Sequence, residues 1–141
     1  MKTASYSKLW QKIHLEAAKK GLPLRVMFEL TYRCNFKCKH CYVPDSYRAG
    51  RKEIKTKEVF YILNQLRDNG CLYLGFTGGE PFMRKDILDI LYYAKKCGFQ
   101  IIIYTNASLI DEKIARELGR VGLNKVDITI PAISSRVFDS I

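Results

Sequence analysis

Three of the five cysteines in this 141-residue sequence fall inside eight residues, at spacings of four and then three. They are Cys34, Cys38 and Cys41, in the stretch CNFKCKHC. Three thiolates in one segment can bind a soft metal, and the neighbouring cations Arg33 and Lys37 favour the deprotonated thiol. The stretch is therefore a candidate metal site.

The residues alone leave three uses of this segment open. On a helix the cysteines would share one stripe, but its neighbours are mostly charged, which disfavours burial in a core. A structural zinc needs a fourth ligand, and His40 is awkwardly placed for that role because it directly precedes Cys41. A 4Fe-4S cluster usually takes four cysteines, so three would leave one iron open for chemistry.

The apolar pattern along the chain predicts an α/β fold with a parallel sheet. An amphipathic helix is expected at residues 7–20, with Leu9, Ile13 and Ala17 at helical spacing. Apolar runs and helical stripes then alternate, which favours a parallel sheet covered by helices. Strands are expected at 24–30, where the apolar run predicts a buried strand, and at 71–76, 100–105 and 125–130. Helices are expected at 56–69, with Thr56 as a candidate N-cap, and at 87–97 and 111–122.

The polar segments of the sequence follow the predicted strands. The cysteine segment follows the first strand, TGGEP (77–81) the second and TNAS (105–108) the third, while Thr129 closes the fourth. Because the carboxyl ends of parallel strands meet at one edge, these segments are expected to converge there. Cys71 and Cys97 lie toward the opposite edge, so we expect both to be buried.

Two of these segments resemble the motifs of one family. CNFKCKHC is similar to the CxxxCxxC signature of radical S-adenosylmethionine (SAM) enzymes, and TGGEP is similar to their GGE motif. The resemblance covers about residues 22–141 and implies the first four strands of a partial (β/α)6 TIM-like barrel, preceded by an N-terminal helical segment at 1–21. The later strands of that barrel are absent, so we expect a truncated core, and whether these 141 residues are active alone stays open.

The resemblance implies two cofactors, a 4Fe-4S cluster and SAM. Cys34, Cys38 and Cys41 would each bind one iron, and the amino and carboxylate groups of SAM would chelate the fourth. An electron from the reduced cluster would cleave SAM to methionine and a 5'-deoxyadenosyl radical, which abstracts hydrogen from a substrate, so the protein is expected to be an oxidoreductase-type enzyme. No side chain is assigned as a catalytic group. An external electron donor of the flavodoxin or ferredoxin kind is implied.

The resemblance also implies that the TGGEP turn binds SAM. Gly78 and Gly79 lack side chains, so their backbone can approach a ligand closely. Glu80 offers a carboxylate that can accept hydrogen bonds from the ammonium group of SAM. We therefore expect all three residues to contact the methionine part of SAM.

Three further residues match SAM-site positions of the family. His40 would lie beside the adenine, and Thr129 near the ribose or the carboxylate. Asn106 lies in a turn that faces the substrate or is stabilised by its own side chain. Two residues depart from the family pattern, since Ala107 replaces a usual glycine and Pro131 stands where many relatives are acidic.

The segment LRVMFELTYRCNFKCKHCY (24–42) looks most like the subgroup with auxiliary-cluster (SPASM-type) C-terminal extensions. Its members mature peptides, enzymes, or tetrapyrrole and quinone cofactors, so a peptide or a cofactor precursor is the expected substrate. Two other functions stay open: a non-enzymatic zinc-binding module and a simple iron-sulfur electron carrier.

Composition and charge limit the partners and the setting. The 24 Lys and Arg against 14 Asp and Glu give a net charge of +10, but the basic residues are spread over helix faces without a nucleic-acid motif. We therefore expect a solvated surface and no nucleic-acid partner. No apolar run approaches a membrane span, and the N-terminal segment lacks the apolar core of a signal peptide, so we expect a cytoplasmic protein with reduced cysteines.

Overall fold

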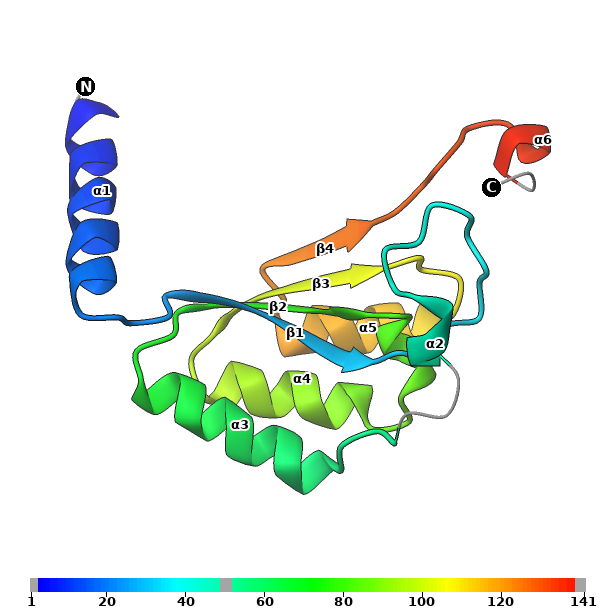
Figure 1. Ribbon diagram of the computed structural model, residues 1–141, viewed down its shortest axis with the longest axis horizontal. Coiled ribbons are helices and arrows are strands. Elements are labelled where there is room, and N and C mark those ends of the chain that lie inside the picture. Colours follow the sequence, from blue (N-terminus) through cyan, green and yellow to red (C-terminus); the bar gives the residue numbers. More distant parts are fainter. Residues whose placement is uncertain (1–2, 49–51, 139–141) are drawn as a thin grey trace.

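The chain alternates strands and helices after one N-terminal helix. The computed structural model describes residues 3–48 and 52–138, and Figure 1 shows its elements in order. They are α1 (Thr3–Lys19), β1 (Arg25–Thr31), α2 (Asp45–Arg48), α3 (Thr56–Asp68), β2 (Tyr73–Gly78), the 3-10 helix η1 (Pro81–Met83), α4 (Ile87–Lys96), β3 (Gln100–Thr105), α5 (Glu112–Val121), β4 (Lys125–Ile128) and α6 (Ser135–Phe138).

The four strands form one parallel sheet in the order β1-β2-β3-β4. Its register aligns Phe28 with Phe76, Phe76 with Ile103, and Ile103 with Val126. Each connection returns through a helix, so all four carboxyl ends lie at the same edge, on the right of Figure 1. The predicted fold class, a parallel α/β sheet preceded by a helix, is confirmed.

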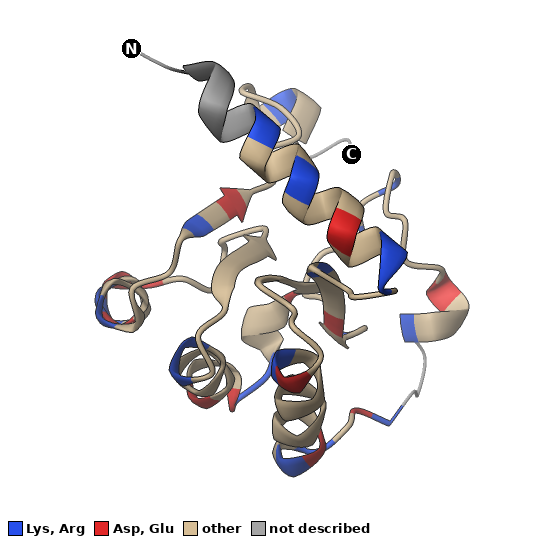
Figure 2. Cartoon of the chain, turned by 90° about the vertical axis from the view of Figure 1, so that its left-hand side faces the viewer, with Lys and Arg blue, Asp and Glu red and all other residues tan. Residues whose placement is uncertain are grey.

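The core lies between the sheet and α3, α4 and α5, which all cover the same face (Figure 1). Figure 2 shows this one-sided arrangement from the α1 end. Val59 and Leu63 of α3, together with Ile90 and Leu91 of α4, are fully buried beneath Phe76. Each such side chain contributes roughly 1.5–3 kcal/mol through its removal from water. This layer holds the strands in place beneath the site.

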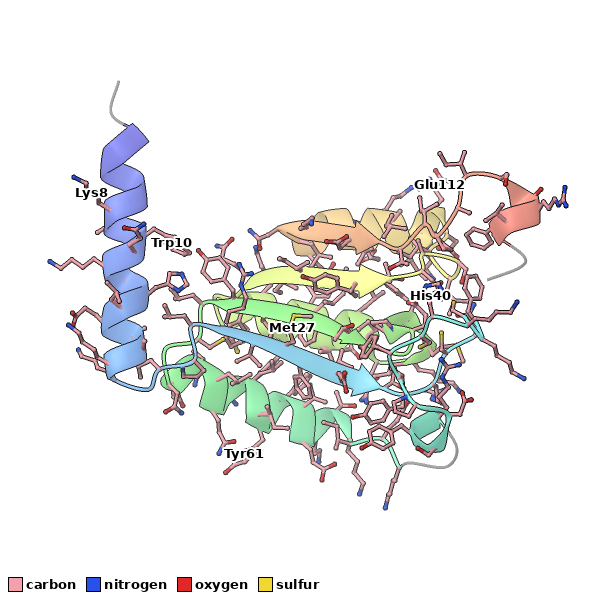
Figure 3. The ribbon with its side chains drawn as sticks, turned by 45° about the horizontal axis from the view of Figure 1, so that its top comes forward. Lys8, Trp10, Met27, His40, Tyr61 and Glu112 are labelled. Carbon is pink, nitrogen blue, oxygen red and sulfur yellow. The ribbon has the colours of Figure 1, made fainter. Side chains whose placement is uncertain are left out.

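The other face of the sheet is open, which corrects the expectation that the first strand is buried. Burial alternates along β1, and Met27 is 51% exposed on the face turned toward the viewer in Figure 3. Gly75 lies beneath it, where a Cβ would meet the Met27 sulfur at 2.4 Å and the Tyr104 ring at 3.2 Å. An apolar run cannot reveal this, because it does not show that helices cover only one side.

Helix α1 stands at the amino edge of the sheet, away from the cysteine loop (Figures 1 and 3). Its contact is made by Trp10, whose ring lies edge-on to Tyr73 with centroids 5.5 Å apart. Of the predicted apolar stripe, Ala17 is buried, but Leu9 and Ile13 are exposed. The helix was correctly predicted, but its apolar stripe does not pack against the described sheet. Among the helices of residues 3–48 and 52–138, none has the length and apolarity needed to cross a membrane.

Two local predictions need correction. Thr56 does not cap α3, because Lys55 occupies the cap position and the Thr56 hydroxyl donates to Asp86 at 2.6 Å. Cys97 is half-buried rather than buried, while Cys71 is buried as predicted. Both cysteines lie near the amino edge of the sheet, since Cys71 precedes β2 and Cys97 directly follows α4.

A buried ion pair fastens the end of β1 to the segment before α4. Arg84 is 4% exposed and donates to both Asp86 oxygens, at 2.9 and 2.7 Å. It also donates to the carbonyls of Leu30, at 3.0 Å, and Ile54, at 3.1 Å. Burial alone would raise the pKa of Asp86, but hydrogen bonds from Arg84 and Thr56 and the charge of Arg84 outweigh it and lower that pKa.

Asp86→Asn should destabilise the protein by about 3 kcal/mol, because it leaves a buried guanidinium without its counter-charge. The folded-state pKa of Asp86 is depressed, so its contribution is present above the unfolded pKa of about 4 and is lost as pH falls through the folded value. Urea unfolding at neutral and acidic pH measures both effects. Asp68→Asn, which breaks the exposed Arg67 pair, is the control and should leave the free energy of unfolding almost unchanged.

Candidate functional site

The three clustered cysteines line one cavity at the carboxyl edge of the sheet. Cys34, Cys38 and Cys41 lie in the loop after β1, are half-buried, and border an open cavity of ≈ 810 Å³. Within the loop, the Cys41 amide donates to the Cys38 carbonyl at 3.2 Å, and the Phe36 amide to the Cys34 sulfur at 3.4 Å. The structure therefore brings the three predicted metal ligands to one cavity.

The arrangement of the three thiols bears on the kind of metal group that they can hold. Within residues 3–48 and 52–138, no three His, Cys, Asp or Glu side chains are gathered closely enough to hold a single metal ion. In an iron-sulfur cluster each thiolate binds a different iron, so its ligands stand further apart. Burial raises the pKa of the Cys71 thiol, which disfavours a thiolate there.

A second cavity, of ≈ 300 Å³, adjoins the first and shares Cys38 with it. It brings together His40 from the cysteine loop, Asn106 from the turn after β3 and Thr129 beyond β4. The predicted fourth strand is shorter than expected and ends at Ile128, although the Thr129 amide still donates to the Thr105 carbonyl at 3.1 Å. Three predicted SAM-site residues, distant in sequence, thus border one cavity.

The two glycines after β2 lie against the protein backbone itself. A Cβ on Gly78, which has φ of 129°, would stand 2.1 Å from the Thr31 carbonyl oxygen, and one on Gly79 would stand 2.2 Å from the Arg33 carbonyl oxygen. The Gly79 amide donates to the Thr31 carbonyl at 2.7 Å. We had expected the missing side chains to make room for a ligand. In the structure they make room for the start of the cysteine loop.

Glu80 is fully buried and joins three segments. Its Oε1 accepts from the Phe82 amide at 3.1 Å and the Thr105 hydroxyl at 2.8 Å, and its Oε2 accepts from the Asn106 amide at 2.8 Å. Its own amide donates to the Arg33 carbonyl at 2.8 Å. The sequence indicated a carboxylate that faces a ligand. In the structure both carboxylate oxygens instead accept hydrogen bonds from the protein itself, so Glu80 links β2, β3 and the cysteine loop.

The turn after β3 is also tied to the cysteine loop. The Asn106 side chain donates to Asn35 at 3.0 Å and accepts from the Ser108 hydroxyl at 2.7 Å, while Asn35 donates to that hydroxyl at 2.7 Å. Ala107 has φ of 60°, the left-handed region in which glycine is unstrained. This explains why glycine is usual at that position. Asn35 was missed, because nothing in the sequence distinguishes it from a solvated loop residue.

Tyr42, another residue that sequence reasoning missed, holds the end of the cysteine loop over β2. Its hydroxyl donates to the Gly78 carbonyl at 3.2 Å and lies 3.3 Å from the Thr77 hydroxyl. Although the residue is 63% exposed, removal of its hydroxyl from water raises the pKa of Tyr42, and the charge of Glu29 raises it further. The signal in the sequence that could have indicated this role is the position of Tyr42 directly after Cys41.

The other end of the loop is fastened by an ion pair. Arg33 donates to the two Glu53 oxygens, at 2.7 and 3.1 Å, and to the Met83 carbonyl at 2.8 Å. The Thr31 hydroxyl also donates to Glu53. Burial would raise the pKa of Glu53, but the hydrogen bonds from Arg33 and Thr31 and the Arg33 charge outweigh it and lower that pKa. The cysteine loop is therefore anchored at both ends.

A family model, the radical SAM superfamily, matches residues 28–141, which include the second half of β1, the cysteine loop, the glycine turn and the strands β2, β3 and β4. The chain belongs to the radical SAM superfamily. It is thus part of an enzyme family, and the predicted membership is confirmed. One curated relative, the Fe-coproporphyrin III synthase of Methanosarcina barkeri (strain Fusaro / DSM 804), is 37% identical over 108 residues, which are 77% of this chain and 27% of the relative.

Solved structures of other proteins share the fold. Streptococcus suis SuiB bound to the precursor peptide SuiA superposes with a TM-score of 0.76 at 24% identity, over 93% of this radical SAM chain and 30% of SuiB. BtrN in complex with AdoMet and 2-DOIA gives a TM-score of 0.69 at 23% identity, over 84% of this chain and 50% of BtrN. The chain therefore spans 30% of SuiB, 27% of the curated synthase and 50% of BtrN.

Proposed function

We propose that this chain forms the cluster- and SAM-binding part of a radical SAM enzyme. The observation that carries the proposal is the pair of adjoining cavities, one bordered by the three cysteines and the other by His40, Asn106 and Thr129. Cys38 borders both cavities, so a ligand in the second would lie next to a metal group in the first. Family membership supports the same reaction class.

Cys34, Cys38 and Cys41 fit a 4Fe-4S cluster as its three protein ligands, because their thiols surround one cavity and cations flank them. When bound, the cluster supplies the electron that cleaves SAM to methionine and a 5'-deoxyadenosyl radical. The chain's own contribution is positional: Arg33–Glu53 fixes the start of the loop and Tyr42 its end. This keeps the three thiols facing one cavity.

The same structure supports SAM in the second cavity. His40, with its flat ring, is suited to the adenine, and the Thr129 hydroxyl and Asn106 amide can bond to polar groups of SAM. Gly78, Gly79 and Glu80 would act on SAM through the backbone of their turn, since the Glu80 side chain is buried and bonded to the chain. Glu80 is thus a positioning residue in this proposal.

The two rival functions account for less of the site. A zinc module requires no second cavity beside the cysteines, and a simple electron carrier requires a fourth cysteine ligand. Cys71 and Cys97 lie near the opposite edge of the sheet, where neither can reach the loop that holds the other three. The five free thiols support a reducing, cytoplasmic setting as part of this proposal.

For the substrate, we propose a tetrapyrrole or a peptide, processed with the auxiliary-cluster type of extension. The relative named as an Fe-coproporphyrin III synthase supports the first, and the structure named as SuiB with its precursor peptide supports the second. The open sheet face carries Met27 and Tyr104 and is available to such a molecule.

The test of this function is detection of SAM cleavage. The chain is reconstituted anaerobically with iron and sulfide, reduced with dithionite and mixed with SAM, and 5'-deoxyadenosine is measured by chromatography. We expect 5'-deoxyadenosine to form, and none to form with Cys38→Ala. SAM binding without cleavage would contradict the activity while retaining the site. A colourless chain that binds zinc and no SAM would favour the zinc module.

A further inference from the structure

Arg48, the last residue of α2, carries a buried polar group that the fold leaves unbonded. Its side chain is 19% exposed, and its Nε is shut off from water without a hydrogen-bond partner in residues 3–48 and 52–138. No other buried side-chain nitrogen or oxygen of those ranges is in this state. The Asp45 carboxylate lies 3.9 Å from the Nε, too far for a hydrogen bond, and is 98% exposed. A guanidinium is always charged and can only donate, so Arg48 lacks an acceptor.

The comparison with Arg84 shows what a buried arginine requires. The Arg84 guanidinium is bonded to Asp86 and to two backbone carbonyls. Removal of a charged group from water is costly unless new hydrogen bonds replace the lost ones. A buried polar group that stays unpaired in a native fold is rare, and a bound ion or a redox role is among the reasons for it. The cavities that Arg48 borders are the places where such a partner can bind.

Arg48 borders the cavity of the three clustered cysteines. Figure 1 shows α2 beside the cysteine loop, at the carboxyl end of β1. Arg48 and the three cysteines line the same cavity of ≈ 810 Å³, whereas Arg48 does not line the cavity proposed for SAM. It also borders a smaller cavity beside β1, of ≈ 320 Å³, but neither of the acids there, Glu29 and Glu53, bonds to it. The cysteine cavity is therefore where an acceptor can reach Arg48.

α2 is held in place without the Arg48 guanidinium. The Tyr47 ring packs edge-on against the Tyr32 ring just beyond β1, with centroids 5.5 Å apart. The Tyr47 amide donates to the Pro44 carbonyl at 2.9 Å. The long contact between Arg48 and the exposed Asp45 contributes little, because water screens it. The fold thus keeps Arg48 beside the cysteines and leaves its guanidinium to bind something else.

We propose that Arg48 donates a hydrogen bond to a sulfur of the cluster that the three cysteines hold, and so raises the reduction potential of that cluster. The inference rests on the proposed function, which includes the cluster. The cysteine and sulfide sulfurs carry negative charge and accept hydrogen bonds, and such bonds help to set the potential. The reduced cluster carries one more negative charge than the oxidised cluster. A cation that bonds to it therefore favours the reduced form.

Burial distinguishes Arg48 from the other cations of this cavity. Lys39 borders the same cavity but is exposed, so water and salt screen its charge. A charge that protein covers acts through a medium of lower dielectric constant and is screened much less. Arg48 should therefore change the potential more than an exposed lysine at a similar place.

The experiment is a redox titration of the loaded chain without SAM. Wild type and Arg48→Gln are reconstituted with iron and sulfide, and the reduced cluster is measured by electron paramagnetic resonance at potentials set with dithionite and mediator dyes. Dithionite supplies the one electron that each cluster gains. We expect the ratio of reduced to oxidised cluster at a fixed potential to fall at least ~3-fold in Arg48→Gln, which lowers the midpoint by roughly 30 mV. Lys39→Gln is the matched control and should change the ratio less than ~1.5-fold.

Urea unfolding of the full chain before iron loading separates this role from a structural one. Arg48 has no hydrogen bond to lose there, so Arg48→Gln should leave the urea midpoint unchanged. A marked drop would overturn the proposal, because Arg48 would then have a partner within the chain. An unchanged potential would overturn it, and so would an equal shift in Lys39→Gln, because charge alone would then be sufficient. If SAM binding weakens while the potential stays the same, the acceptor is SAM and the proposal is wrong.

Failure of this inference can be told apart from failure of the proposed function. If wild type loads a cluster that SAM perturbs, and Arg48→Gln has the same potential, only the role of Arg48 is refuted. If wild type loads no iron-sulfur cluster, both are refuted. Should Arg48→Gln itself hold no cluster, Arg48→Lys is titrated in its place. It keeps the charge but lacks the planar set of donors, so we expect a smaller fall in the same ratio, and an unchanged ratio would overturn the proposal.

Discussion

Cys38→Ala should reduce the iron content after anaerobic reconstitution from roughly four irons per chain to fewer than one. Cys38 borders both cavities, so its loss removes a ligand at the centre of the site. Two thiols are too few to hold a cluster, and an exposed iron edge would be lost to solvent or chelator. Iron and sulfide analysis, together with the visible absorbance of the cluster, measures the effect. Cys34→Ala and Cys41→Ala should behave alike.

The matched controls are the two cysteines away from the loop. Cys71 is buried beside β2 and Cys97 is half-buried after α4, both near the amino edge of the sheet. Cys71→Ala and Cys97→Ala should therefore keep the full iron content. Loss of the cluster in Cys97→Ala would show that the ligand assignment is wrong.

Glu80→Ala should both destabilise the protein and weaken SAM binding. The Glu80 side chain is fully buried, and its loss leaves three donors without their acceptor: the buried Thr105 hydroxyl and the partly buried amides of Phe82 and Asn106. Each buried group left unsatisfied costs about 1–3 kcal/mol, so we expect a total loss of roughly 3–5 kcal/mol in the free energy of unfolding. The turn after β3 would shift with it, and Asn106 would no longer be held at the second cavity.

Urea unfolding and equilibrium dialysis of SAM measure the two effects of Glu80→Ala together. The control is Glu58→Ala, which removes an exposed acceptor for the Lys55 amide at the start of α3 and should cost about 1 kcal/mol without an effect on SAM. Weaker SAM binding with unchanged stability would instead support direct contact between Glu80 and the ammonium group, as the sequence indicated. No change in either quantity would remove both roles.

The order and type of the elements followed from the sequence because its signals are strong and local. β3 was predicted at its observed bounds, since the apolar residues 101–104 form an unbroken run shortly after Gly98. α5 begins after Asp111, whose side chain accepts from the Ile114 amide, and ends at Gly122 with φ of 69°. Caps of this kind are visible in sequence as residue types at the ends of a helical stripe.

Burial and long-range pairing could not be predicted in the same way. Glu80 was correctly placed after β2, but its partners Thr105 and Asn106 belong to a turn 25 residues further on. Arg33–Glu53 likewise joins residues 20 apart. Such contacts depend on how the strands are packed side by side, and periodicity does not encode that. The sequence thus indicated which segments meet at the carboxyl edge of the sheet, whereas the contacts between their residues could be seen only in the fold.

The central claim is that three cysteines leave one iron of a 4Fe-4S cluster open to SAM, and electron paramagnetic resonance tests it most directly. The reconstituted chain is reduced anaerobically and its spectrum is recorded with and without SAM. The account predicts the signal of a reduced 4Fe-4S cluster whose g-values change when SAM is added, and which is absent in Cys38→Ala. A cluster signal that SAM leaves unchanged, or a chain that takes up zinc in place of iron, would contradict it.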